Sequence, residues 1–140
     1  MHAHVTGSIG EDVLRRSLDA IQARHPLLRV RIERDGWNRL SFKTSKVPRL
    51  PLRIVDESAD TWVEEAEKEL HEEFPVREGP LMRCTLVRHG QEDNTVLLSF
   101  HHAIGDAISG SFLMRDLFQA MALAYSGKSA NYRPWSQRER

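Results

Sequence analysis

The stretch HHAIGD at residues 101–106 lies between two apolar segments, and the rest of the fold can be worked out from it. The residues before it, NTVLLSF at 94–100, have the short length and the β-branched and aromatic content of a buried strand. If the strand alternation continues, His102 shares a face with Phe100 and His101 points to the opposite face. One ring would then enter the core and the other would face a cavity. An imidazole there suits proton transfer, because its reference pKa is about 6.5.

Length, charge and cysteine content limit the class of protein. The 140 residues fit one domain with a real hydrophobic core, and 40% hydrophobic with 29% charged residues indicates a soluble globular chain. The 20 basic and 20 acidic residues balance, so no basic field indicates a nucleic-acid partner. Residues 1–10 lack the features of a secretory signal and no apolar run approaches the roughly 20 residues of a membrane span, so we expect a cytoplasmic protein. The single Cys84 cannot form an intrachain disulfide; we expect it to be a small buried side chain and expect no structural metal site.

The first half of the chain predicts a helix followed by a hairpin. Pro26 ends the helix, because proline restricts the residue before it and lacks an amide hydrogen. The Asp35-Gly36 pair is a hairpin signal between two apolar runs. In chain order we expect a short strand at 4–8, a helix at 11–24, a strand at 27–34, a return strand at 37–43 and a short strand at 52–55.

The second half predicts a helix, two paired strands and a long helix, at 59–74, 81–89, 94–100 and 107–125. The helix at 59–74 is expected to bury an apolar face made of Val63, Ala66, Leu70 and Phe74. Its charged residues, Glu64, Glu65, Lys68 and Glu72, are expected to form a solvated face. The strands are expected to pair antiparallel across a turn at residues 90–93.

The last helix is apolar over more than half of its circumference. One stripe consists of Leu113, Leu117, Ala120 and Ala124, and a second consists of Met114, Phe118, Met121 and Tyr125. Such a helix is buried on two sides or presents one stripe to a partner. The elements together predict an α/β fold, an α+β two-layer sandwich with a mixed, largely antiparallel sheet and helices packed on one side.

Three short motifs occur in order along these elements. RHPLLR at 24–29 ends the first helix, EGPLMR at 78–83 enters a strand, and HHAIGDAIS at 101–109 follows a strand. In this order they resemble the arginine motif, the next landmark and the active-site motif of the condensation-domain and chloramphenicol-acetyltransferase-like acyltransferase superfamily. The resemblance covers residues 5–127. It implies a chloramphenicol-acetyltransferase-like half, the amino-terminal lobe of such a domain at residues 1–127, with a linker-like tail at 128–140.

The resemblance implies a role for each residue of the active-site motif. His102 would be the general base that removes a proton from a hydroxyl or amine acceptor as it attacks an acyl thioester. The thioester is a co-substrate held on coenzyme A or on the phosphopantetheine arm of a carrier protein, as in natural-product biosynthesis, and no bound cofactor is implied. His101 would support the loop through a hydrogen bond, and Asp106 would pair with Arg24 in a structural role. The other matching positions are Gly105 and Ser109.

Two departures from the family pattern bear on activity. Ala107 stands where the family has glycine, so its methyl group would narrow the channel for the substrate arm. The chain also resembles only one of the two lobes of a full member. We therefore expect activity to need a second lobe or a homo-oligomer partner. The alternative function is a catalytically inactive half-domain that binds a carrier protein or another protein chain.

The residues alone leave other interpretations of the two histidines open. A core histidine beside a solvent-exposed one needs no function, and a metal site would draw on His101, His102 and Asp106. Neighbouring strand side chains diverge, which disfavours a shared metal, so we expect none. A nucleophilic Ser99 or Ser109 would need a G-x-S-x-G turn, which the sequence lacks.

Overall fold

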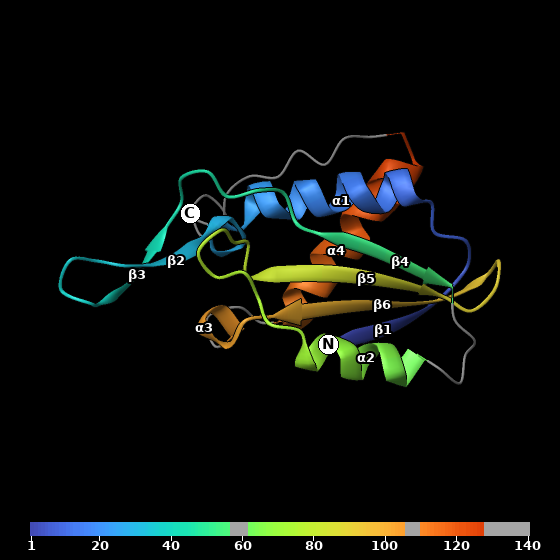
Figure 1. Ribbon diagram of the computed structural model, residues 1–140. Helices are drawn as coiled ribbons and strands as arrows, with labels where there is room; N and C mark the ends of the chain where they lie inside the picture. Colours follow the sequence, from blue (N-terminus) through green and yellow to red (C-terminus); the bar gives the residue numbers. More distant parts are fainter. Residues whose placement is uncertain (57–61, 106–109, 128–140) are drawn as a thin grey trace.

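The computed structural model describes residues 1–56, 62–105 and 110–127, and it contains a four-stranded sheet with order β1-β6-β5-β4 and a separate two-stranded sheet, β2-β3 (Figure 1). The strands are β1 (His2–Thr6), β2 (Arg31–Arg34), β3 (Leu40–Lys43), β4 (Leu52–Asp56), β5 (Met82–Arg88) and β6 (Asp93–Phe100). The helices are α1 (Glu11–Arg24), the 3-10 helix η1 (Pro26–Arg29), α2 (Trp62–His71), α3 (His102–Gly105) and α4 (Gly110–Tyr125). β6 pairs antiparallel with β1 and β5, and β4 pairs parallel with β5, so the predicted mixed, largely antiparallel sheet is confirmed.

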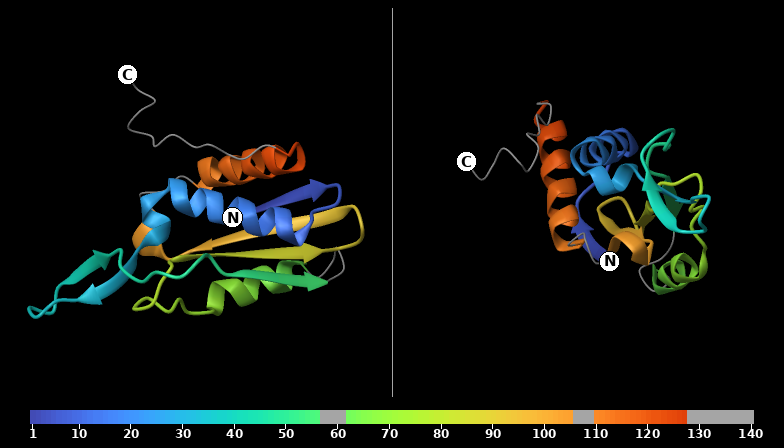
Figure 2. Two further views of the ribbon diagram at one scale, coloured as in Figure 1. Left: turned by 90° about the horizontal axis from the view of Figure 1, so that it is seen from above. Right: turned by 90° about the vertical axis from the view of Figure 1, so that its left-hand side faces the viewer.

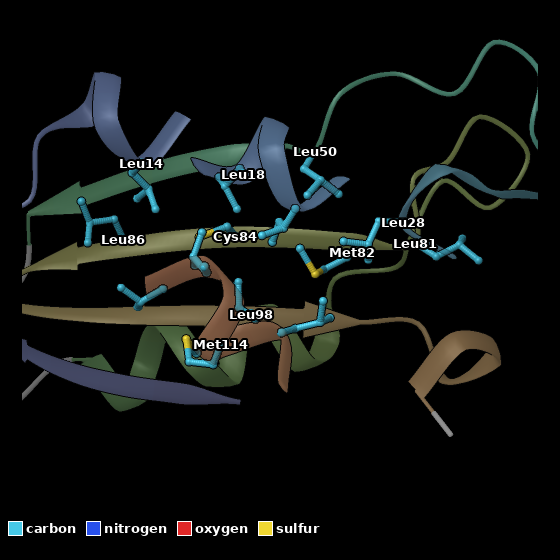
Figure 3. Close-up of a cluster of buried hydrophobic side chains, with 14 of the residues drawn as sticks. Leu14, Leu18, Leu28, Leu50, Leu81, Met82, Cys84, Leu86, Leu98 and Met114 are labelled. Atoms are coloured by element: carbon cyan, nitrogen blue, oxygen red, sulfur yellow. The ribbon is translucent and has the colours of Figure 1, made fainter. Parts of the chain in front are cut away.

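The hydrophobic core lies between the four-stranded sheet and helices α1 and α4, which cover one of its faces (Figure 2). Alternate residues of the paired strands β5 and β6 point into this core, with Cys84 opposite Leu98. Leu14 and Leu18 of α1 are completely buried against them (Figure 3). The prediction that Cys84 is a small buried side chain is confirmed, since it is 1% exposed.

Helix α2 lies on the opposite face of the sheet (Figure 2). The expectation of helices on one side therefore holds for α1 and α4 and is wrong for α2. Glu65 and Glu69 of α2 are only 2% and 6% exposed, whereas Val63 and Leu70 are 47% and 83% exposed. The predicted solvated acidic face is wrong for Glu65, and the predicted buried apolar face is wrong for Val63 and Leu70. The reason is electrostatic: arginines of the sheet point toward α2 and pair with its carboxylates.

The second apolar stripe of α4 is used within the chain. Met114 and Met121 are 7% and 5% exposed and belong to the core. The hydroxyl of Tyr125 accepts a hydrogen bond from the Gly10 amide at 2.9 Å and donates one to the Ser8 carbonyl at 3.2 Å. Of the two alternatives for this stripe, burial on two sides holds for Met114 and Met121, whereas Tyr125 remains 56% exposed.

The backbone conformation explains the glycine of the EGPLMR motif. Gly79 has a φ of +64°, and a Cβ added there would lie 2.7 Å from the Val30 carbonyl oxygen. Glycine adopts this conformation without strain, and any other residue would place its Cβ against that oxygen. The Ile32 amide donates a hydrogen bond to the Val76 carbonyl at 2.7 Å. The segment that follows α2 is thereby joined to the base of the β2-β3 hairpin, which begins at Arg31 because Pro26–Arg29 forms η1 rather than strand.

Candidate active site

The two histidines of the HHAIGD stretch lie just beyond the end of β6. Strand alternation stops at Phe100, since His102 already begins α3, and the amide of Ile104 donates to the carbonyl of His101 at 3.1 Å. The two imidazole rings are stacked, with centroids 4.3 Å apart and planes 25° apart. The prediction that they point to opposite faces is therefore wrong. The reason is that the chain turns into a helix one residue after the strand.

The ring of His101 is held in one tautomer. Its Nδ1 accepts a hydrogen bond from the Ala103 amide at 3.0 Å, so the proton of the neutral ring is on Nε2. The family resemblance implies a loop hydrogen bond for His101, and the structure has one. Burial, together with the charge of His102, lowers the pKa of His101 below the ordinary histidine value. A neutral imidazole thus lies under the exposed ring of His102.

Both rings line a cavity of about 770 Å³ between α2, the segment that follows it, the first residues of the chain and the last residues of β6. Its wall is partly apolar and includes Leu70, Phe74 and Phe100. Its polar lining includes Ser99 and Glu69. A cavity of several hundred cubic ångströms, with apolar walls and a few polar groups, has the dimensions of a small-molecule site.

A single buried carboxylate, that of Glu69, connects α2 to three strands of the sheet. It accepts hydrogen bonds from Arg83 Nε, from Arg53 Nη2 at 2.9 Å, from Thr85 Oγ1 at 2.9 Å and from Ser99 Oγ at 3.2 Å. Burial would raise the pKa of Glu69, but the hydrogen bonds of Arg83 and Thr85 and the charges of Arg83 and Arg53 hold it below the ordinary value. Glu69 is therefore ionised beside the cavity at neutral pH.

An aromatic ring connects this network to the histidines. The guanidinium carbon of Arg83 lies 4.2 Å from the ring centroid of Phe74. Phe74 in turn meets His101 edge to face, with centroids 6.0 Å apart and planes 82° apart. These contacts form a continuous column from Glu69 through Arg83 and Phe74 to His101 and His102, which we call the histidine column. The helical pattern predicts Phe74 on a buried face and gives no sign of this contact.

Arg24, the arginine of the first motif, has a fully buried side chain. Its Nη1 lies 3.3 Å from Asp116 Oδ1, and Asp116 Oδ2 lies 2.8 Å from His25 Nε2. Asp116 comes from α4, so the pair joins the end of α1 to α4. The predicted partner of Arg24, Asp106, lies outside the described residues. The sequence signal for Asp116 is a lone carboxylate on the apolar stripe of its helix, and no local pattern joins it to Arg24.

The remaining predicted site residues are less informative. Gly105 is exposed at the end of α3, with open space where a Cβ would stand. Ala107 and Ser109, like the linker-like tail at 128–140, lie outside the described residues. Within the described ranges, no group of three or more histidine, cysteine or acidic side chains is arranged to hold a metal ion. None of the helices described here is both long and apolar enough to cross a membrane.

Comparison with known proteins identifies the family. The profile of the condensation domain matches residues 1–138. The chain is 31% identical to the phosphinothricin tripeptide synthetase PhsC of Streptomyces viridochromogenes, over 88% of this chain and 12% of that protein. Among solved structures, it resembles SgcC5 of Streptomyces globisporus with 29% identity and a TM-score of 0.72, over 95% of this chain and 32% of that one.

A second solved structure shows the same fold at lower identity. The first condensation domain of the calcium-dependent antibiotic synthetase superposes with a TM-score of 0.80 at 16% identity, over 94% of this chain and 35% of that one. The chain belongs to the condensation-domain family, as the three motifs predicted. It spans about a third of the length of these solved relatives.

Proposed function

We propose that the chain carries the general base of a condensation-type acyl transfer, and that this base is His102. The observation that supports it best is the exposed His102 ring, stacked on a neutral His101 at the edge of a large cavity. A stacked but exposed imidazole can reach a substrate and exchange a proton with it. A base positioned in this way typically contributes about 10²- to 10⁴-fold to the rate.

The proposed reaction joins an acyl thioester to an amine or hydroxyl. The acceptor nitrogen or oxygen attacks the thioester carbonyl carbon while His102 takes the acceptor's proton. The carbon–sulfur bond then breaks, and the thiolate leaves with the proton that His102 returns. The thioester would be held on coenzyme A or on the phosphopantetheine arm of a carrier protein, and the name of the related tripeptide synthetase favours an amine acceptor.

A partner would complete the site. The chain spans about a third of its solved relatives, and the described residues that line the cavity come from α2, the segment after it, β6, the two histidines that follow β6 and the start of the chain. We propose that a second lobe or another copy of the chain provides the remaining wall. The substrates would then meet His102 between the two.

An inactive binding module is the second candidate function. One observation favours it: the β2-β3 hairpin extends from the body of the molecule and exposes Trp37, Leu40 and Phe42 at 81%, 63% and 48% (Figure 1). Aromatic side chains such as those of Trp37 and Phe42 are enriched at protein interfaces. In this case the hairpin, and not the histidines, would carry the function.

A thiol-release assay distinguishes the two functions. The protein is incubated with a simple acyl thioester and an amine, and free thiol and acylated amine are measured for the wild type and for His102→Ala. The protein's own thiol interferes little, because burial raises the pKa of Cys84 to about 12. Transfer that is lost in His102→Ala supports the general base, and equal rates in the two proteins contradict it. No transfer by either protein supports the binding module or a chain that is inactive without its second lobe.

A further inference from the structure

The orientation of His102 depends on a stack of rings rather than on a hydrogen bond. Within the described part of the chain, the ring of His102 makes no side-chain hydrogen bond, and its aromatic contact is the stack on His101. His101 is fixed by the Ala103 amide on one side and by the edge-to-face contact with Phe74 on another. Whatever fixes Phe74 therefore also fixes the direction of the proposed base.

Phe74 is held by an immobilised guanidinium group. Nη2 of Arg83 donates to the main-chain carbonyls of Glu69 at 2.9 Å and Glu72 at 2.7 Å, and its Nε donates to the Glu69 carboxylate. The Glu69 carbonyl belongs to the last turn of α2 and the Glu72 carbonyl directly follows its last residue, His71; a helix leaves carbonyl groups at this end without intrahelical partners. The rigid, planar fork of Arg83 thus ends the helix and presents a flat face to the ring that follows it.

We infer that Phe74 is a positioning residue for the two histidines: clamped by Arg83, its ring holds His101 in the orientation that directs His102 into the cavity. The inference rests on the proposed function of His102. The proposed transfer also requires that His101 is uncharged, because a charged His101 would repel the protonated His102 that forms during transfer. Phe74 contributes here by covering the His101 ring.

The test is proton NMR of the histidine rings in the 140-residue chain as a function of pH, and it needs no substrate. In Phe74→Leu the apolar volume remains and the aromatic ring is lost, so we expect the His101 and His102 ring signals to shift. The titration midpoint of His101 should rise toward the ordinary value of about 6.5. Phe74→Tyr keeps the ring and should restore wild-type signals.

Two further variants control the experiment. Arg83→Lys keeps the positive charge near Glu69 and loses the planar stack, so it should shift the same signals as Phe74→Leu by a smaller amount, and it tests the column even if Phe74→Leu does not fold. Phe42→Leu is the matched control, because it makes the same replacement on the exposed hairpin. Unchanged histidine signals in both Phe74→Leu and Arg83→Lys would overturn the inference, as would equal shifts in Phe42→Leu.

The NMR titration and the transfer assay test the positioning role of Phe74 and the catalytic role of His102 separately. Shifted histidine signals in Phe74→Leu, together with equal transfer rates in the wild type and His102→Ala, would support the histidine column and contradict only the catalytic role of His102. Where transfer is measurable, Phe74→Leu should lower the turnover rate by up to about 10²-fold, as expected of a displaced catalytic group, and Phe74→Tyr should recover most of it. An unchanged turnover rate in Phe74→Leu would count against positioning even if the signals shift.

Discussion

The two faces of the four-stranded sheet differ sharply in chemistry although the same strands build both. Toward α1 and α4, β5 presents Cys84 and Leu86 to an aliphatic core. Toward α2, the neighbouring residues of the same strand are Arg83 and Thr85, which bind the carboxylate of Glu69. Strand alternation alone separates an apolar layer from an ionic one.

Because of this difference in chemistry, one face of the sheet mainly provides stability and the other mainly fixes the geometry of the site. Burial of aliphatic side chains is favourable in any orientation, so the α1/α4 face contributes most of the stability. Buried ion pairs lose much of their Coulombic attraction to the cost of dehydration, but their hydrogen bonds fix directions. The ionic face lies beside the cavity and ends in the histidine column. We therefore expect substitutions on the two faces to separate stability from function.

The largest expected effect comes from Asp116, a charge on the otherwise apolar side. Asp116→Ala leaves Arg24 and His25 without the carboxylate that both contact, and removal of one member of a buried pair costs about 3–5 kcal/mol. Urea unfolding should show this loss. Asp19→Ala is the matched control, because the Asp19 side chain is 40% exposed and its two partners, Arg15 and Arg49, pair with it at the surface, so it should cost about 1 kcal/mol or less. Equal losses in the two variants would show that Asp116 is not the buried link between α1 and α4.

The next effect tests the aliphatic face itself. Leu18 is fully buried in the core, and Leu18→Ala should lower the free energy of unfolding by about 2–5 kcal/mol through lost burial and a cavity. Leu70 of α2 is 83% exposed, so Leu70→Ala removes the same atoms with an effect within about 0.5 kcal/mol. Thermal or urea unfolding of both proteins checks this. A large loss in Leu70→Ala would mean that α2 packs with its apolar side inward.

A smaller, pH-dependent effect is expected on the ionic face. Glu69→Gln removes the charge that Arg53 and Arg83 share and should cost about 1–3 kcal/mol at neutral pH. Because the folded-state pKa of Glu69 is lowered, its contribution is complete above the unfolded value of about 4.3 and is lost as the pH falls through the folded value. The stability difference from the wild type should therefore shrink in acid. Glu72→Gln, at a side chain that is 60% exposed, is the matched control and should cost less than about 1 kcal/mol at neutral pH; an equal loss in the two variants would contradict the assignment.

The sequence predicted the sheet well and the orientation of α2 poorly, for one physical reason. Strand signals such as the alternation in β5 and β6 reflect burial on the core face, which is apolar. The position of α2 depends on a long-range match between its carboxylates and arginines from β4 and β5. A single helix cannot reveal such a match, and its apolar residues Val63 and Leu70 indicated the wrong side.

The sequence predicted which residues form the motif of the site, but it did not predict how their side chains are arranged. The HHAIGD stretch identified the end of β6 and the two histidines, whereas their stacking depends on where the strand stops and α3 begins. The contact between Phe74 and His101 joins residues far apart in sequence, so no local pattern reports it. Asp116 was visible as a carboxylate on an apolar stripe, but its partners at the end of α1 were not.

The central claim is that the exposed ring of His102 serves chemistry while the opposite face of the sheet provides stability. The most direct measurement pairs two readouts on His102→Ala: the free energy of unfolding in urea and the rate of thioester-dependent transfer. We predict a free energy of unfolding within about 0.5 kcal/mol of the wild type and a transfer rate lower by about 10²- to 10⁴-fold. A strongly destabilised variant, or one that transfers at the wild-type rate, would contradict the account.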